Sequence, residues 1–201
     1  MVLTSTISKK LGFKAPDFRL LEPLTNKYVK LDDVKSKHVT LIVFMCNHCP
    51  YVIHILPQLV KIANDYKKNG VSVVGINSND ISEYPDDSPE KMLDLIKKYK
   101  IPFPYLFDET QEIAKSYYAA CTPDFSLFNS DMICLYRGQM DFSRPGNDLA
   151  NDGKDIRMAI DAIISGKNVQ FPQLPSIGCN IKWKKYLTIF YKIYLILFLL
   201  C

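Results

Sequence analysis

The stretch Leu41-Ile42-Val43-Phe44-Met45-Cys46-Asn47-His48-Cys49-Pro50 decides the fold. Its five leading apolar residues predict a buried strand, and two cysteines at C-x-x-C spacing follow directly. Pro50 then opens an amphipathic run, which suits the first turn of a helix because the N–H that proline lacks would have no partner there. A strand that leads through C-x-x-C into a helix is typical of redox proteins, since it brings two sulfurs within bonding distance.

The two cysteines of this motif are expected to differ in chemistry. We expect Cys46 to lie at the helix N-terminus, where unpaired backbone N–H groups stabilise a thiolate. His48 is expected to add positive charge and to lower the pKa of that thiol further. Zinc sites use the same spacing and would recruit His48 or His54. The sequence has no second C-x-x-C and no H-x-x-x-H pair, so redox chemistry is preferred over a metal site or inert cysteines.

Composition indicates one globular domain. The chain has 201 residues, 48% of them hydrophobic and 23% charged. Of its 25 basic residues, four lysines lie beyond residue 181, which leaves 21 basic residues against 21 acidic ones. A neutral body without a Gly-rich phosphate loop argues against a nucleic-acid partner, and we expect no cofactor and no metal.

The cysteine count and the N-terminus bear on location. Six cysteines are too few for a disulfide scaffold in a chain of this length. Residues 1–10 lack the apolar core of a secretory signal. We therefore expect a reducing, cytoplasmic location.

Further elements follow from apolar patterning. Residues 71–76 predict the next strand, so that strand, helix and strand form a parallel crossover. Ser88-Pro89 predicts the start of a helix that reaches Tyr99. The loop of residues 77–89 follows the carboxyl end of a central strand, where α/β sheets place ligands, but a solvated connector is the preferred interpretation. The acidic residues of this loop are Asp80, Asp86 and Asp87.

The C-terminal half predicts a hairpin and a helix. Pro123 directly precedes a strand and is a candidate cis peptide bond. Residues 124–128 and 132–137 predict an antiparallel hairpin, and residues 152–165 a final helix. Near the N-terminus, residues 14–31 predict another hairpin.

This order of elements resembles the thioredoxin fold. The chain is similar to peroxiredoxin-like, thioredoxin-domain proteins of the AhpC/TSA superfamily over about residues 10–184. The phrases that carry the resemblance are APDF at 15–18, FMCNHCPYV at 44–52, CTPDF at 121–125, YRGQ at 136–139 and PSIGCNIKW at 175–183. The resemblance implies an α/β fold with a central mixed sheet flanked by helices and an N-terminal β extension as in peroxiredoxins.

The resemblance implies conflicting roles for the two motif cysteines. In thioredoxin-like members the position of Cys46 attacks and that of Cys49 resolves. In peroxiredoxins the position of Cys49 is peroxidatic and a threonine stands three residues earlier, where this chain has Cys46. The peroxiredoxin arginine has no clear counterpart in this chain, and no motif supports Arg144, the one candidate. These departures favour a thiol–disulfide oxidoreductase over the alternatives, which are a thiol peroxidase with Cys49 peroxidatic and Cys46 resolving, or a non-catalytic redox-sensing or zinc-binding module.

Other residues are expected to support this site. The supporting residues are His48, Pro50, Thr122 and Pro123. By resemblance, Thr122 and a cis Pro123 would face the pair and offer backbone groups to a substrate strand. Cys121 and Cys179 are possible auxiliary thiols, each balanced against a place in the core, whereas Cys134 is expected in the core. The expected partners are a protein or low-molecular-weight disulfide substrate and a thiol reductant.

The C-terminal tail stands apart from the domain of residues 10–184. Residues 186–201 are strongly apolar, with Lys192 as their only charge. Sixteen residues of helix span about 24 Å, less than the roughly 30 Å of a bilayer core. The tail, residues 185–201, is therefore interpreted as a non-native end or a weak membrane anchor.

Overall fold

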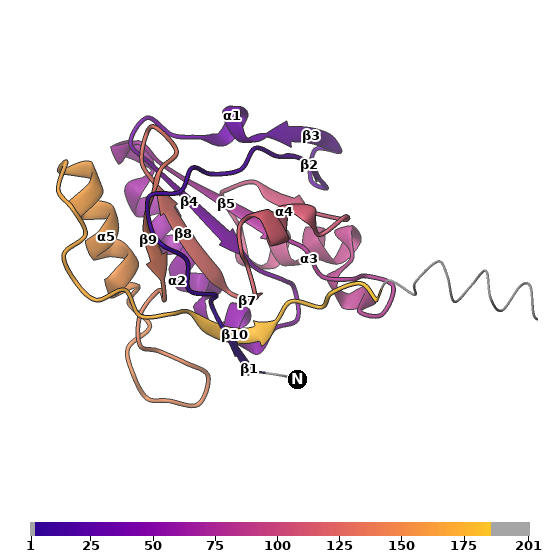
Figure 1. The fold of residues 1–201 in the computed structure, drawn as a ribbon. Coiled ribbons are helices and arrows are strands. Elements are labelled where there is room, and N and C mark those ends of the chain that lie inside the picture. Colours follow the sequence, from indigo (N-terminus) through magenta and orange to yellow (C-terminus); the bar gives the residue numbers. More distant parts are fainter. Residues whose placement is uncertain (1–2, 186–201) are drawn as a thin grey trace, which may run out of the picture.

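The computed structural model describes residues 3–185. Figure 1 shows a twisted central sheet with helices packed on both of its faces. The strands are β1 (Leu3–Ser5), β2 (Arg19–Glu22), β3 (Lys27–Lys30), β4 (Val39–Phe44), β5 (Val71–Asn77), β6 (Tyr105–Phe107), β7 (Cys121–Thr122), β8 (Asp124–Phe128), β9 (Cys134–Gly138) and β10 (Ile177–Asn180). The helices are α1 (Leu31–Val34), α2 (Pro50–Tyr66), α3 (Pro89–Tyr99), α4 (Glu112–Ser116) and α5 (Lys154–Ile164), with short 3-10 turns at Lys67–Asn69 and Pro85–Asp87.

The main sheet has seven strands in the order β3-β2-β6-β5-β4-β8-β9. The pairs β4–β5 and β5–β6 are parallel and the others are antiparallel, so the sheet is mixed, as expected. Every residue of β4 is buried. Leu41 and Val43 pack with the residues of α2 on one face, and Ile42 and Phe44 pack in a second cluster on the other. This two-sided burial explains the unbroken apolar run before the motif.

Most of the predicted elements are confirmed, with shifted ends. Helix α3 begins after Ser88, whose Oγ accepts the Lys91 N–H at 3.4 Å. Helix α4 begins at Glu112, and the Asp108 carboxylate accepts the Ala114 N–H in its first turn at 2.9 Å.

A second, three-stranded sheet in the order β1-β10-β7 was not predicted. It joins the two ends of the described chain, and Figure 1 shows β1 and β10 side by side at one edge of the molecule. Strand β7 is the two-residue segment directly before Pro123. The small sheet therefore ties the C-terminal segment to the proline turn.

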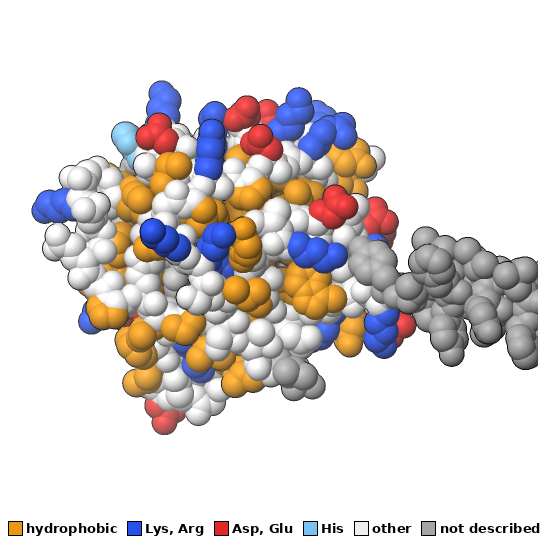
Figure 2. Space-filling view, in the orientation of Figure 1, with side chains coloured by type: hydrophobic (Ala, Val, Ile, Leu, Met, Phe, Trp, Pro, Cys, Tyr) orange, Lys and Arg blue, Asp and Glu red, His pale blue; other side chains and the backbone are white. Residues whose placement is uncertain are grey.

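The surface bears on the expected lack of a nucleic-acid partner, and the tail bears on the expected membrane anchor or non-native end. Figure 2 shows acidic and basic side chains interspersed among apolar ones over the face in view, without a basic stripe. Within residues 3–185, no helix combines the length and the apolar character needed to cross a bilayer. The apolar tail interpreted as an anchor or non-native end lies outside the described residues.

Candidate active site

The two motif cysteines lie between the end of β4 and the start of α2. Both side chains are buried, with Cys46 1% exposed and Cys49 0%. Cys49 is the N-cap of α2, and Pro50 is its first helical residue. The expectation that Cys46 occupies the helix N-terminus was wrong. Because the helix begins at Pro50, the first unpaired N–H groups lie beside Cys49 instead.

Thr122 faces both cysteines from the neighbouring turn. The Thr122–Pro123 peptide bond is cis, which confirms the candidate named from the sequence. The Thr122 Oγ1 lies 3.4 Å from Cys46 Sγ. The carbonyl oxygen of Thr122 lies 3.2 Å from Cys49 Sγ and accepts its hydrogen bond when Cys49 is protonated. Thr122 thus contacts the two sulfurs with different atoms.

Cys179 brings a third sulfur to the motif. Its Sγ lies 2.6 Å from Cys49 Sγ, and its side chain is 4% exposed. When Cys49 is ionised, its sulfur accepts hydrogen bonds from the Cys179 and Cys46 thiols and from the Val52 N–H, which holds the pKa of Cys49 far below its ordinary value. The pKa values of Cys46 and Cys179 are raised, because each donates to Cys49 and is removed from water. The three thiols therefore concentrate one negative charge on Cys49.

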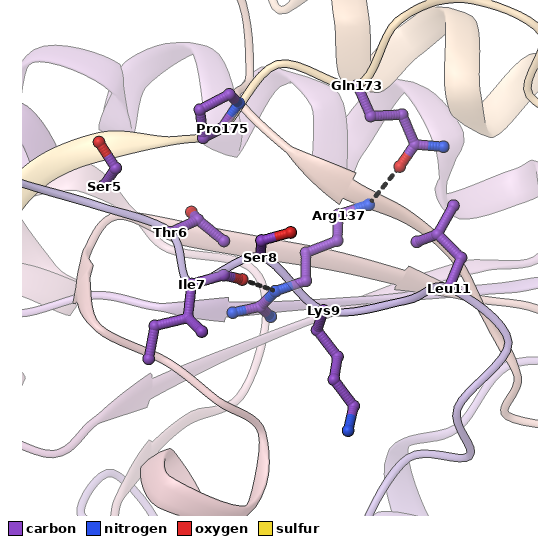
Figure 3. A pocket seen from close by; sticks show the side chains of 9 residues that line it. All are labelled: Ser5, Thr6, Ile7, Ser8, Lys9, Leu11, Arg137, Gln173 and Pro175. Carbon is purple, nitrogen blue, oxygen red and sulfur yellow. Dashed lines mark hydrogen bonds between the residues drawn. The ribbon is translucent and has the colours of Figure 1, made fainter.

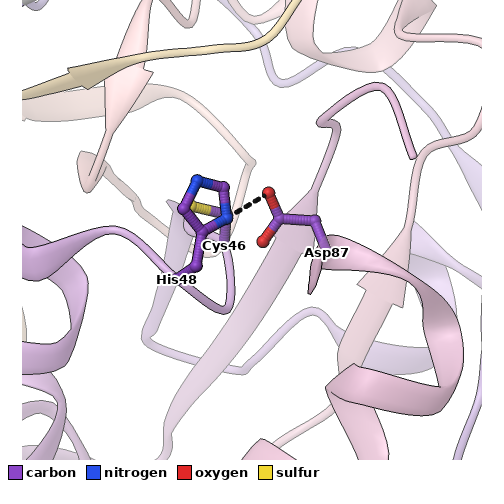
Figure 4. Close-up of side chains that lie close together, drawn as sticks. All are labelled: Cys46, His48 and Asp87. Atoms are coloured by element: carbon purple, nitrogen blue, oxygen red, sulfur yellow. Dashed lines mark ion pairs between the residues drawn. The ribbon is translucent and has the colours of Figure 1, made fainter. Parts of the chain in front are cut away.

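His48, inside the motif, is paired with a carboxylate. Figure 4 shows the His48 imidazole against Asp87, with the Cys46 sulfur close by. His48 Nδ1 lies 2.8 Å from Asp87 Oδ2, and this contact raises the pKa of His48. The Asp87 charge also raises the pKa of Cys46. The pKa of Cys46 is thus raised rather than lowered as expected, first by its hydrogen bond with Cys49, then by burial, and then by the Asp87 charge.

Asp87 is a site residue that sequence reasoning missed. It is fully buried, so the interpretation of its loop as a solvated connector was wrong at this position. The Asn47 N–H donates to its Oδ1 and the Asn79 side-chain amide to its Oδ2, each at 2.7 Å. The available signal was its place, in a loop after a central strand and directly before the Ser88 cap.

One group of side chains offers ligand atoms for a metal. Among the described residues, Cys46, His48 and Asp87 bring a sulfur, a nitrogen and an oxygen within 4.8 Å of one another. The carboxylate is already engaged by two amide groups and by the imidazole. A metal ion would have to displace these interactions and deprotonate Cys46, whose pKa is raised.

Other expected residues lie away from the motif sulfurs. Cys121 is buried with its Sγ toward Thr6 Oγ1 at 4.0 Å and the Pro123 carbonyl at 3.6 Å, and burial raises its pKa. Cys134 is in the core, as predicted. Arg144 donates to backbone oxygens of its own loop and to Gln139 Oε1, so its side chain is committed there rather than to Cys49.

A cavity of about 370 Å³ lies beside the N-terminal segment (Figure 3). Its wall includes Arg137, Gln173 and residues 5–9, and it contains none of the motif residues. The Arg137 guanidinium is held by Ser126 Oγ, the Tyr118 carbonyl and Asp124. Since that charge is already paired, the cavity adds nothing to the chemistry of the thiols.

Comparisons with known proteins agree with this architecture. The AhpC/TSA family model matches residues 11–137. An uncharacterized conserved protein from Geobacillus kaustophilus has a solved structure with a TM-score of 0.90 and 52% identity, over 92% of this chain and 97% of that one. The thioredoxin domain of a thiol-disulfide oxidoreductase from Bacteroides vulgatus matches with a TM-score of 0.59 and 19% identity, over 76% of this chain and 99% of that one.

A relative with an assigned name is similar in sequence. The thiol-disulfide oxidoreductase ResA of Halalkalibacterium halodurans is 25% identical over 133 residues, which are 65% of this chain and 70% of that protein. Fold and motif together define a thioredoxin-fold protein with a C-x-x-C pair at the start of α2. Within that class, the chain belongs to the AhpC/TSA family.

Proposed function

We propose that this protein is a thiol–disulfide oxidoreductase whose exchanging couple is Cys46 and Cys49. The observation that carries the proposal is the placement of Cys49 at the N-cap of α2, where the Val52 N–H and two thiols stabilise its ionised sulfur. Thiolates are the nucleophiles of disulfide exchange. The similarity to ResA, a protein named for this activity, supports the same chemistry.

The order of steps is the one that thioredoxin-like members imply, with Cys46 as the attacking thiol. Cys46 loses its proton as its sulfur attacks a substrate disulfide, while Cys49 stays ionised. The first substrate thiolate leaves and takes up that proton. Cys49 then attacks the mixed disulfide, the second substrate thiolate is protonated by solvent, and Cys46–Cys49 remains oxidised. A thiol reductant closes the cycle in the reverse sense.

The proposed partners are a protein or low-molecular-weight disulfide substrate and a thiol reductant. We propose no nucleic-acid partner, and the proposed location is cytoplasmic.

Two features restrict the access of a substrate to the Cys46–Cys49 couple. All three sulfurs are buried, and β10 pairs with β7 at Thr122. The substrate strand expected beside Thr122 would therefore have to displace β10. A small disulfide needs less movement, so we expect it to react faster than a folded protein.

The test is a redox titration of the full chain in glutathione buffers, with acid quenching, thiol trapping and reduction of a model disulfide. We expect one reversible two-electron couple that corresponds to a disulfide between Cys46 and Cys49. Cys46→Ser and Cys49→Ser should each abolish that disulfide. Stoichiometric zinc in freshly purified protein, or peroxide consumption that depends on Cys49 alone, would replace this proposal with one of the two alternatives. Absence of any reversible couple would refute it outright.

A further inference from the structure

The side chain of Cys179 is aimed at the motif by strand pairing. Strand β10 runs antiparallel to β7 with Cys179 opposite Thr122. Residues directly opposite each other in such a pair project from the same face of the sheet. Thr122 contacts both motif sulfurs, and Cys179 Sγ accordingly lies 2.6 Å from Cys49 Sγ. The contact follows from the register of the strands.

Gly178 allows β10 to come this close. A Cβ at position 178 would lie 2.0 Å from the Thr122 carbonyl oxygen and 2.7 Å from its carbon, both backbone atoms. Any side chain there would force the strand away from the proline turn. Glycine at position 178 therefore permits the contact between Cys179 Sγ and Cys49 Sγ.

Contacts on both sides of Cys179 hold β10 in place. The Ser176 hydroxyl donates to the Pro123 carbonyl at 2.6 Å, and the Thr6 N–H donates to the Ser176 carbonyl at 2.9 Å. Beyond the strand, the Lys182 N–H donates to Asn79 Oδ1 at 2.8 Å. A sulfur fixed on both flanks is positioned for reaction with its neighbour.

We propose that Cys179 is a third redox-active thiol, which converts the Cys46–Cys49 disulfide into a Cys49–Cys179 disulfide. The proposal rests on the proposed function, because that exchange supplies the first disulfide. Cys179 attacks the Cys49 sulfur, the Cys49–Cys179 bond forms and the Cys46–Cys49 bond breaks. Cys46 leaves as a thiolate and takes up the proton that Cys179 loses, so the step needs no external oxidant or reductant.

This step separates the attacking thiol from the stored disulfide. After it, Cys46 is again a thiol beside Thr122 Oγ1, while the protein remains oxidised by two electrons. Cys49 Sγ is the sulfur that both disulfides share, and it accepts hydrogen bonds from the Cys46 and Cys179 thiols when it is ionised.

Mapping the disulfides of the full-length wild-type chain tests the proposal. The protein is oxidised in glutathione buffers, quenched with acid, alkylated under denaturing conditions and digested with trypsin. Cys46 and Cys49 share a tryptic peptide that does not contain Cys179, so a linked pair of peptides reports the second disulfide. We expect that pair, with the alkyl label on Cys46. Oxidised protein that carries only Cys46–Cys49, with Cys179 fully alkylated, would overturn the proposal and leave the proposed function standing.

Serine variants provide matched controls. Cys46→Ser should still form Cys49–Cys179, and Cys46→Ser/Cys121→Ser should do so equally, because Cys121 does not contact Cys49. Cys46→Ser/Cys179→Ser should lose the linked peptides entirely. Retention of a Cys49-containing intramolecular disulfide in that last variant would also overturn the role of Cys179. If wild type and variants all lack a reversible disulfide, the proposed function itself fails.

Discussion

Cys121 and Cys179 lie on adjoining strands of one small sheet, yet their surroundings differ. Cys179 stands opposite Thr122 and meets Cys49, whereas Cys121 stands opposite Asn180 and faces Thr6. Successive side chains of a strand project to opposite faces, so a shift of one residue turns a thiol from the motif cysteines toward Thr6. Burial is similar for both, and the neighbouring sulfur is what distinguishes them.

The largest effect is expected at the cysteine that Cys179 contacts. Cys49→Ser removes the atom common to both disulfides and should lower disulfide-exchange activity by roughly a hundredfold or more, because neither disulfide can form. Reduction of a small model disulfide, measured with Cys134→Ser as the control, checks this. Substantial activity in Cys49→Ser would mean that Cys46 works without either neighbour.

Displacing β10 should move Cys179 away from Cys49, so that Cys179, like Cys121, no longer contacts a motif sulfur. Gly178→Ala places a Cβ against the Thr122 backbone and should destabilise the fold by about 1–3 kcal/mol through overpacking. Cys179 should then react with a maleimide under native conditions while Cys134 stays protected. The control is Ile177→Ala, which removes volume. Unchanged stability and unchanged Cys179 protection in Gly178→Ala would contradict the close approach.

The charge of Asp87, which pairs with His48, can be altered separately. Asp87→Asn should lower the pKa of Cys46 and the pKa of His48, because the carboxylate raises both. Alkylation of Cys46, followed in a Cys49→Ser background, should shift to lower pH, and the His48 NMR titration should shift the same way. Asp86→Asn, a neighbouring exposed acid, is the control. An unshifted Cys46 profile would show that Asp87 does not act on this thiol.

The same contact has a consequence for stability. The pKa of His48 is raised in the folded protein, so its pairing with Asp87 stabilises the fold fully below the unfolded pKa of histidine. That contribution is lost as pH rises through the folded pKa. The difference in unfolding free energy between wild type and Asp87→Asn should therefore narrow from acidic to alkaline pH.

The smallest effect is expected at Cys121. Cys121→Ser changes a buried thiol whose contacts are with Thr6, Pro123 and Ser176, and should leave the couple and its potential unchanged. The cost in stability should be about 1–3 kcal/mol if the new hydroxyl finds no partner, and less if it bonds the Pro123 carbonyl. Redox titration and thermal unfolding of this variant check both statements. A displaced potential would place Cys121 in the redox cluster after all.

Local sequence patterns predict most strands of the main sheet, and they predict the motif cysteines and the Thr122–Pro123 turn of the site. The apolar run before Cys46, the Ser88-Pro89 cap and the Thr-Pro turn each act over a few residues, so the sequence predicts them directly. The pairing of β10 with β7 joins residues far apart in the chain, and no local signal specifies its register. Asp87 was missed for the same reason, since its burial depends on the distant Asn47 and His48.

The pairing of Leu3 with Cys179 has a consequence for how the molecule is assembled. It closes a loop of nearly the whole described chain, and contacts of such high sequence separation form late because their closure entropy must be overcome first. The main sheet and the C-x-x-C turn need no residue beyond α5. We therefore expect the two motif thiols to be neighbours before Cys179 joins them, because the pairing of β10 with β1 has the greater sequence separation.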